Sequence, residues 1–337
     1  MFKMKNLWWL AALIAFAAFP LIQQNPSYRS IGVWTLVYMA SAASWNIFSG
    51  YSGYIALGSG VFFGSGAYTM ALIANHAHMA PGASLFWLVP VAGLVAMAIS
   101  VPFGWIALRV RRHTFVVITI AFFFIFQNFA SNVSFTGGTS GMQLPFITWG
   151  VTYYDLPFYY VALGLVIFVT VLSALVRRSR FGLQLLAIRD DEDRALGLGV
   201  NVMAVKMTGF AISSFAIGAC GAIYALYIGQ VYPAGSGFAF DPLFDLSIAM
   251  MTFLGGLGTL VGPLLGALIL ESAQQYLTVN YSNGSLYLIL LGALFLGVFL
   301  LMPQGIIPYV RDRVTKRAER EKAQVADTDL AMVGGDQ

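Results

Sequence analysis

Long apolar segments recur along almost the whole chain, and they constrain its fold more than any other feature. The hydrocarbon core of a bilayer is about 30 Å thick, so a helix that crosses it needs about 17 to 25 mostly apolar residues. Most of the apolar segments have about this length, and the last is long enough for three crossings. They are residues 1–22, 31–48, 55–75, 86–108, 114–131, 158–176, 206–228 and 243–302. The pattern predicts an all-α, polytopic integral membrane protein of about ten spans, or of eight if the last three are really one.

The composition leaves a lipid bilayer as the solvent. The chain is 59% hydrophobic with a mean hydropathy of +0.78. Only 9% of its residues are charged, where a soluble domain carries roughly 25%. No soluble core could absorb that much apolar surface. The net charge of +4 does not indicate a nucleic-acid partner, because the basic residues lie beside apolar spans, where membrane orientation explains them.

The positions of the basic residues predict the orientation. With the N-terminus inside, the chain returns to the cytoplasm at residues 109–112, at 177 and at 311–322, each time beside basic residues. Seventeen of the 18 lysines and arginines then face the cytoplasm, and Arg29 is the sole exception. We therefore expect residues 1–310 to form the transmembrane domain and residues 311–337 to form a cytoplasmic, disordered tail.

Residues 1–22 have two interpretations. Lysines followed by an apolar run, with Ala15 and Ala17 in a small-x-small pattern, are typical of a cleaved signal peptide. The alternative is an uncleaved first membrane helix, which we favour because further spans follow. The topology after residue 22 is the same in both cases.

The only long polar stretch inside the apolar region is residues 177–206, which hold six of the 18 basic residues and four consecutive acids. This stretch must lie in water. If residues 183–196 are helical, one face carries four apolar side chains with a carboxylate among them. These residues are Leu185, Ile188, Ala195, Leu196 and Glu192. Such a stripe suits docking into a partner's groove better than burial in the chain's own core. We expect Gly197 and Gly199 to end the helix.

Four sequence motifs resemble one known family. Residues 187–206, AIRDDEDRALGLGVNVMAVK, are similar to the coupling loop of the LivM-type permease subunits of branched-chain amino-acid ABC importers. The other three motifs are SGYSGYIALGSGVFFGSGAYT at 49–69, FTGGTSGM at 135–142 and FLGGLGTLVGPLLGALILE at 253–271. They occur in the family's order, and the resemblance extends over nearly the whole chain.

The resemblance implies a permease subunit of an ATP-driven importer in the cell inner membrane. Its expected partners are a homologous second permease subunit, two ABC ATPase subunits and an extracytoplasmic solute-binding protein. The expected substrates are branched-chain amino acids, or a related small amino acid, amide or urea. The residues implied in ATPase coupling are Leu185, Ile188, Arg189, Asp190, Glu192, Asp193, Ala195, Gly197 and Gly199. Those implied in a structured outer loop near the pathway are Thr136, Gly137, Gly138 and Gly141.

Two Gly-rich stretches in different halves of the chain match one another. LGSGVFFGSGA at 57–67 and LGTLVGPLLGA at 257–267 share five identities in eleven positions. Many transporters are built from repeated halves whose interrupted, Gly-rich spans meet around the substrate path. Close helix packing through small residues is the alternative for any single glycine. The candidate pathway residues are Gly58, Ser59, Gly60, Gly258, Thr259 and Glu271.

Two acids are expected near or within the spans. Asp245 follows Pro242, so it lies either at the outer interface or within the membrane. Glu271 is deeper and matches an acid in the resembling motif. An unpaired charge at membrane depth costs roughly 2.5 to 3.5 kcal/mol or more, so each carboxyl should be neutral, paired or facing water. We also expect breaks in the last long apolar segment at 255–258 and near 280–284.

The chemistry that is missing narrows the function. No lysine follows a glycine, so the chain has no Walker A motif. We expect ATP and Mg²⁺ on the partner ATPases and no cofactor in this chain. His76 and His78 lack a nearby third ligand, so no metal site is expected. No nucleophile-and-base grouping can be proposed, which disfavours an enzyme.

The leading hypothesis is therefore a permease subunit of an ABC importer. The alternative is a stand-alone secondary carrier or channel for a small neutral solute, because such carriers show intramembrane carboxylates and broken helices.

Overall fold

The structure is a computed structural model. It describes residues 14–23, 25–77, 81–145, 154–233 and 239–280, together with 289, 292–293, 296–297 and 305–309. The predicted break near 280–284 and the predicted tail lie outside the described residues.

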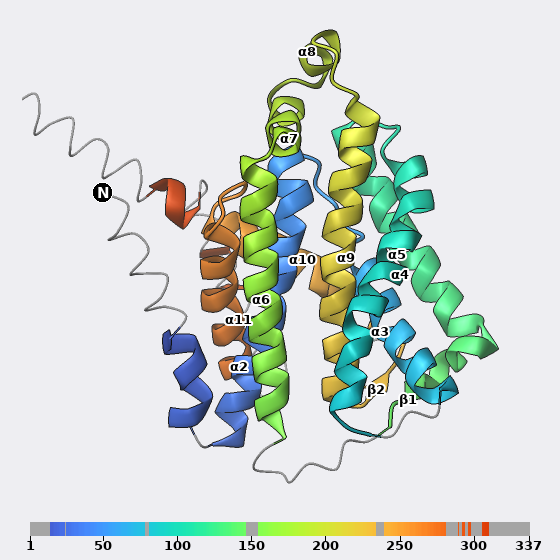
Figure 1. Cartoon of the computed structure of the whole chain (residues 1–337), viewed down its shortest axis with the longest axis vertical. Coiled ribbons are helices and arrows are strands. Elements are labelled where there is room, and N and C mark those ends of the chain that lie inside the picture. Colours follow the sequence, from blue (N-terminus) through green and yellow to red (C-terminus); the bar gives the residue numbers. More distant parts are fainter. Residues whose placement is uncertain are drawn as a thin grey trace, which may run out of the picture.

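Most of the described chain is helical, and most of the long helices lie roughly along the long axis of the molecule (Figure 1). Residues 14–22 form a first helical segment. The longer helices are α2 (Pro26–Trp45), α3 (Gly60–His76), α4 (Leu88–Ala107), α5 (Arg112–Asn132), α6 (Asp155–Arg178), α7 (Arg180–Asp190), α9 (Val202–Ile228), α10 (Pro242–Gly255) and α11 (Gly262–Asn280). The short elements are η1 (Asn46–Gly50), η2 (Ala83–Trp87), η3 (Ser134–Thr136), η4 (Gly138–Ser140), α8 (Glu192–Gly197), β1 (Met142–Gln143) and β2 (Gln230–Val231).

Five helical segments in the described part of the chain are long and apolar enough to cross a membrane. They are Pro26–Gly50, Ala83–Ala107, Arg112–Asn132, Asp155–Arg178 and Val202–Ile228. Pro242–Gly255 is apolar but shorter. The predicted all-α membrane fold is confirmed at this level, and the number of spans stays a prediction.

The core of the bundle is built around α2 and α9, which bury most of their residues, whereas α4, α5 and α6 bury fewer than half of theirs. The exposed positions of α5 and α6 carry large apolar side chains such as Val117, Phe129 and Leu175. Because exposing such an apolar surface to water is unfavourable, these faces are suited to contact with lipid. α9 packs closely on α3, since a Cβ on Gly221 would lie 2.7 Å from the carbonyl carbon of Phe63.

The helical path is interrupted next to both Gly-rich stretches, and the second interruption was predicted. Residues 53–59 are non-helical, so α3 begins only at Gly60, although the apolar segment begins at residue 55. α10 ends at Gly255 and α11 begins at Gly262, which confirms the break expected at 255–258. The backbone turns with φ of +73° at Gly53 and +78° at Gly258, a conformation that side chains with a Cβ rarely adopt. We call residues 50–59, from the last residue of η1 to the start of α3, the first break, and residues 256–261 the second break.

The TGGTSG segment is a structured loop, as predicted. Its two 3-10 turns, η3 and η4, meet at Gly137, which has a φ of +77°. The Thr136 hydroxyl donates to the carbonyl oxygen of Ala130 at 2.7 Å. After the loop, β1 pairs antiparallel with β2, which joins residues 142–143 to residues 230–231. These strands lie at the end of the molecule opposite α8 (Figure 1).

Candidate functional site

The predicted coupling segment is two helices, so the single helix expected over 183–196 is wrong. α7 ends at Asp190 and α8 begins at Glu192. Between them Asp191 is extended, with a φ of −155°. Its Oδ1 accepts the backbone N–H of Arg194 at 3.0 Å. Asp favours such an N-cap over a helix interior because its short side chain satisfies a free backbone N–H. Gly199 ends this region as predicted, with a φ of +85°.

The predicted docking face is wrong at three of its four apolar side chains, which are buried in this chain's own bundle, whereas Leu196 is exposed. Leu185 and Ile188 are 0% exposed and Ala195 is 2% exposed. A Cβ on Gly209 of α9 would lie 3.3 Å from Leu185, so α7 packs on α9 there. The helical period found the apolar stripe, but periodicity does not say which surface covers it. Large apolar side chains that remain exposed here are Leu183 on α7, Leu196 on α8 and Leu198 directly after α8.

Glu192 points inward and lies at the centre of a polar cluster with Lys206 and Tyr54. Its Oε1 lies 2.8 Å from the Nζ of Lys206, and its Oε2 accepts the Tyr54 hydroxyl proton. Lys206 also donates to the Tyr54 oxygen at 3.1 Å and to the carbonyl oxygen of Leu108 at 3.3 Å. Burial raises the pKa of Glu192, but the hydrogen bonds from Lys206 and Tyr54 outweigh it and hold that pKa below its usual value. Glu192 is therefore ionised at neutral pH.

Arg112 holds the end of α7. Its Nη2 donates to the carbonyl oxygens of Ile188 at 2.8 Å and Arg189 at 2.6 Å. The last carbonyls of a helix have no partner within the helix and carry partial negative charge. A guanidinium at this place satisfies both of them and ties α7 to the start of α5.

Arg189 lies against both breaks. Its Nη1 donates to the carbonyl oxygen of Gly50 at 2.8 Å. A Cβ on Gly258 would collide with the same guanidinium, lying 3.4 Å from Cζ and closer still to Nη1. A Cβ on Gly53 would lie 3.0 Å from the Arg189 Cγ. The absence of side chains at these glycines is what lets Arg189 reach the two breaks.

Asn46 joins η1 to the second break. Its Nδ2 donates to the carbonyl oxygen of Thr259 at 2.9 Å, and its Oδ1 accepts the N–H of Gly258 at 2.8 Å. The Thr259 hydroxyl oxygen in turn accepts the N–H of Gly262 at 3.1 Å, which caps α11. Gly258 and Thr259 of the predicted pathway set therefore lie beside η1 and the first break.

The remaining predicted pathway residues fall into two places. Gly60 donates its backbone N–H to both carboxylate oxygens of Asp245, at 3.0 and 3.1 Å, so a buried acid of α10 lies at the N-terminus of α3. Gly58 and Ser59 precede it, and a Cβ on Gly58 would lie 2.9 Å from the carbonyl carbon of Thr119. Asp245 is 3% exposed, so burial within the bundle replaces the interface alternative.

Glu271 stands apart from this group. It lies nine residues beyond Gly262 on α11, which is about 13 Å of helix rise. Its Oε1 accepts from the side-chain amide of Gln275 at 2.8 Å, and its buried Oε2 has no hydrogen-bond partner among the described residues.

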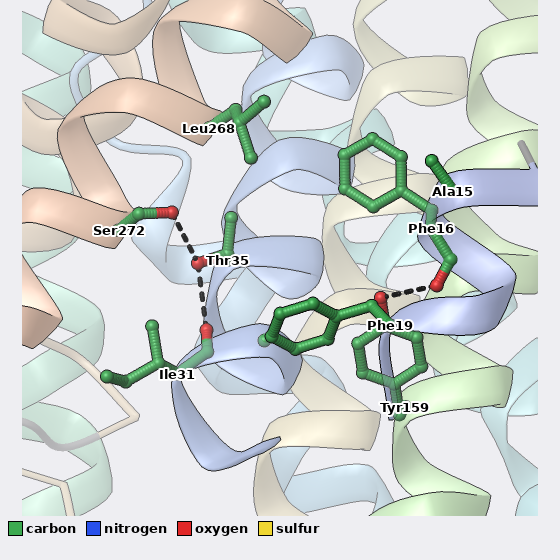
Figure 2. Close-up of a pocket in the computed structure, with 9 residues that line it drawn as sticks. Ala15, Phe16, Phe19, Ile31, Thr35, Tyr159, Leu268 and Ser272 are labelled. Atoms are coloured by element: carbon green, nitrogen blue, oxygen red, sulfur yellow. Dashed lines mark hydrogen bonds between the residues drawn. The ribbon is translucent and has the colours of Figure 1, made fainter. Parts of the chain in front are cut away.

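Two cavities differ sharply in chemistry. A cavity of about 870 Å³ separates the 108–113 loop from α7, α8 and the start of α9, and its walls include arginines and four consecutive acids. Figure 2 shows a smaller one of about 230 Å³ between residues 14–22, α2, α6 and α11, where Thr35 bridges Ile31 and Ser272 and no charged side chain lines the wall. The charged cavity borders the coupling segment and is the one suited to a water-facing partner.

Tyr54, Lys206, Arg112 and Asn46 are site residues that sequence reasoning missed. Lys206 offered the one usable signal, because it stands at the start of an apolar span, where a buried lysine needs a carboxylate partner. Its partner Glu192 lies in the adjacent acidic run.

A helical membrane bundle with two Gly-rich breaks, both touched by a water-facing polar segment, defines a transport protein of the permease class. The chain belongs to the family described as "Branched-chain amino acid transport system / permease component", which matches residues 27–299.

Named relatives fit this assignment. The chain is 28% identical to the high-affinity branched-chain amino acid transport system permease protein LivM of Salmonella typhimurium and, equally, to LivM of Escherichia coli K12, over 96% of this chain and 79% of each relative. It is 27% identical to the corresponding permease protein LivH of Escherichia coli K12, over 80% of this chain and 91% of LivH. No solved structure matches. The protein is thus a multi-pass inner-membrane permease subunit of an ABC importer.

Proposed function

We propose that this chain translocates branched-chain amino acids, or a related small amino acid, amide or urea, through a bundle of about ten spans. The names of its LivM and LivH relatives support the substrate class. LivM and LivH are two different permease proteins, and similarity to both supports pairing with a homologous second permease. Two ATPase subunits that carry ATP and Mg²⁺, and an extracytoplasmic solute-binding protein, complete the proposed importer.

The coupling segment, in this proposal, passes movement of the ATPases to the two breaks. The observation that carries it is the contact of Arg189 with both Gly50 and Gly258. A rigid helix that touches two interrupted helices can bias the bundle between two packings when it is displaced. The exposed Leu196 and Leu198 are the proposed apolar contacts for the ATPase, in place of the buried Leu185.

The test compares substitutions of two arginines on the same helix. Arg189→Met removes the guanidinium that reaches both breaks, whereas Arg180→Met changes an exposed arginine at the other end of α7. In proteoliposomes that contain the complete importer, we expect Arg189→Met to lose uptake while ATP hydrolysis continues, and Arg180→Met to keep both. Normal uptake by Arg189→Met would refute coupling through this helix.

A stand-alone carrier remains the second candidate, favoured by the buried Asp245 at the broken start of α3. Ion-coupled carriers use such intramembrane carboxylates. The purified chain alone in liposomes discriminates the two functions: a carrier moves labelled leucine down an imposed ion gradient, and the permease subunit does not.

A further inference from the structure

The cluster of Tyr54, Glu192 and Lys206 joins three segments that are far apart in the sequence. Tyr54 belongs to the first break, Glu192 begins α8, and Lys206 lies in the first turns of α9. Each member contacts the other two: the lysine lies 2.8 Å from the carboxylate and 3.1 Å from the phenol oxygen, and the phenol donates to the carboxylate. Their meeting therefore fixes the position of α8 relative to the first break.

The tyrosine ring also lies close to two cations. The Lys206 Nζ is 4.4 Å from the ring centroid, and the Arg112 guanidinium carbon is 6.0 Å from it. Cations at such distances are attracted to an aromatic face. Arg112 also holds the carbonyls at the end of α7, so the ring of Tyr54 contacts both helices of the coupling segment through charged groups.

Burial is unequal within the cluster, and this makes α8 its movable part. The Lys206 side chain is 4% exposed, whereas that of Glu192 is 31% exposed. α8 has only six residues and is anchored by Glu192 and by the buried Ala195. If α8 moved away, it would leave a buried ammonium without its carboxylate, which is strongly unfavourable. Tyr54 and Lys206 would therefore follow Glu192 or pull it back.

We propose that Lys206 and Tyr54 are positioning residues for energy coupling: they hold Glu192 so that displacement of α8 is passed to the non-helical residues 53–59 and hence to the start of α3. This deepens the proposed function and rests on it. The route differs from that of Arg189, which starts from α7 and reaches both breaks. The two routes can therefore fail independently.

The chain offers a matched control. Tyr51→Phe removes a buried hydroxyl three residues earlier in the chain, ahead of residues 53–59, where it is hydrogen-bonded to the Ser173 hydroxyl of α6 at 2.8 Å. Tyr54→Phe removes one hydroxyl too, but from the cluster. Comparing the two separates loss of a buried hydrogen bond from loss of coupling. Lys206→Arg keeps the positive charge, and Lys206→Met removes it.

The experiment measures labelled leucine taken up per ATP hydrolysed by the complete importer in proteoliposomes, together with the thermal stability of each variant. We expect Lys206→Met and Tyr54→Phe to lower this ratio about tenfold, a size typical of coupling between two sites, while ATP hydrolysis continues. Tyr51→Phe should keep the wild-type ratio, and Lys206→Arg should restore most of it.

A wild-type ratio in Tyr54→Phe, or an equal fall in Tyr51→Phe and Tyr54→Phe, would overturn the proposal. If Lys206→Met fails to reach the membrane, the tyrosine pair still decides the question. A wild-type ratio in Tyr54→Phe with an uncoupled Arg189→Met would reject this inference alone, whereas normal uptake by Arg189→Met would reject the coupling function beneath it.

Discussion

The crossing of α3 and α9 gives a sharp prediction about stability. A Cβ on Gly66 would lie 2.6 Å from the carbonyl carbon of Gly218 and 2.8 Å from its Cα, and closer still to its carbonyl oxygen. All three atoms are backbone, so no change of rotamer relieves the overlap. Carbon atoms make their best contacts at about 3.5 to 4.0 Å. Gly66→Ala should therefore force the two helices apart by roughly 1 Å.

The magnitude follows from two opposing effects. Overpacking a tight contact costs about 1 to 3 kcal/mol, and a purely backbone contact belongs near the upper end. Replacing Gly by Ala inside a helix raises the free energy of unfolding by up to about 1 kcal/mol. We expect Gly66→Ala to lower the free energy of unfolding by about 2 kcal/mol. Gly164→Ala on α6 is the matched control, because nothing lies within 4 Å of its added Cβ, and it should be neutral or slightly stabilising.

The chain's single cysteine supplies the assay. Cys220 is 0% exposed and lies on α9, so a thiol-reactive dye should label it in detergent only when the bundle opens. Labelling on heating then gives an unfolding midpoint, which should fall by a few degrees in Gly66→Ala, given about 2 to 4 °C per kcal/mol in chains of 150 to 250 residues. A Gly66→Ala midpoint at or above that of Gly164→Ala would refute the packing argument.

Two further predictions concern orientation and pH. Arg194→Cys should react with a membrane-impermeant thiol reagent only from the cytoplasmic side, and the buried Cys220 should not react. Labelling of this variant from outside in intact cells would reject the predicted orientation. The lowered pKa of Glu192 means that its contribution to stability is present above the ordinary glutamate pKa of about 4.3 and is lost as the pH falls through the lowered value. Titration of Glu192 should therefore not change the uptake rate of the wild type near neutral pH. Lys206→Met removes one cause of the lowered pKa, so this variant should lose its remaining uptake at a higher pH than wild type. Superimposable pH profiles of the two proteins would contradict this.

The sequence predicted features that local chemistry decides. Glycines predicted the break at 255–258, where Gly258 has a backbone conformation that side chains with a Cβ rarely adopt. Apolar length predicted the membrane fold, and the motifs predicted the family. Asp191 was also readable in principle as an N-cap, but the continuous helical period on both sides of it favoured a single helix.

Features decided by distant contacts were not predictable. Glu192 turns inward because Tyr54, 138 residues away, and the buried Lys206 receive it. The pattern of residue types along the chain does not show that these three side chains contact one another. The pairing of β1 with β2 was missed for a related reason, since strands of two residues each carry no period of their own.

The two breaks differ in how the coupling segment reaches them. Arg189 contacts both, but Tyr54 adds a second link from α8 to the first break alone. The first break leads directly into α3, whose first N–H groups meet the carboxylate of Asp245 on α10. Since α10 itself ends at the second break, movement of residues 53–59 has a hydrogen-bonded route to that break. We therefore expect displacement of α8 to act first on α3 and only through it on α10, so that variants at Tyr54 disturb the start of α3 more than that of α11.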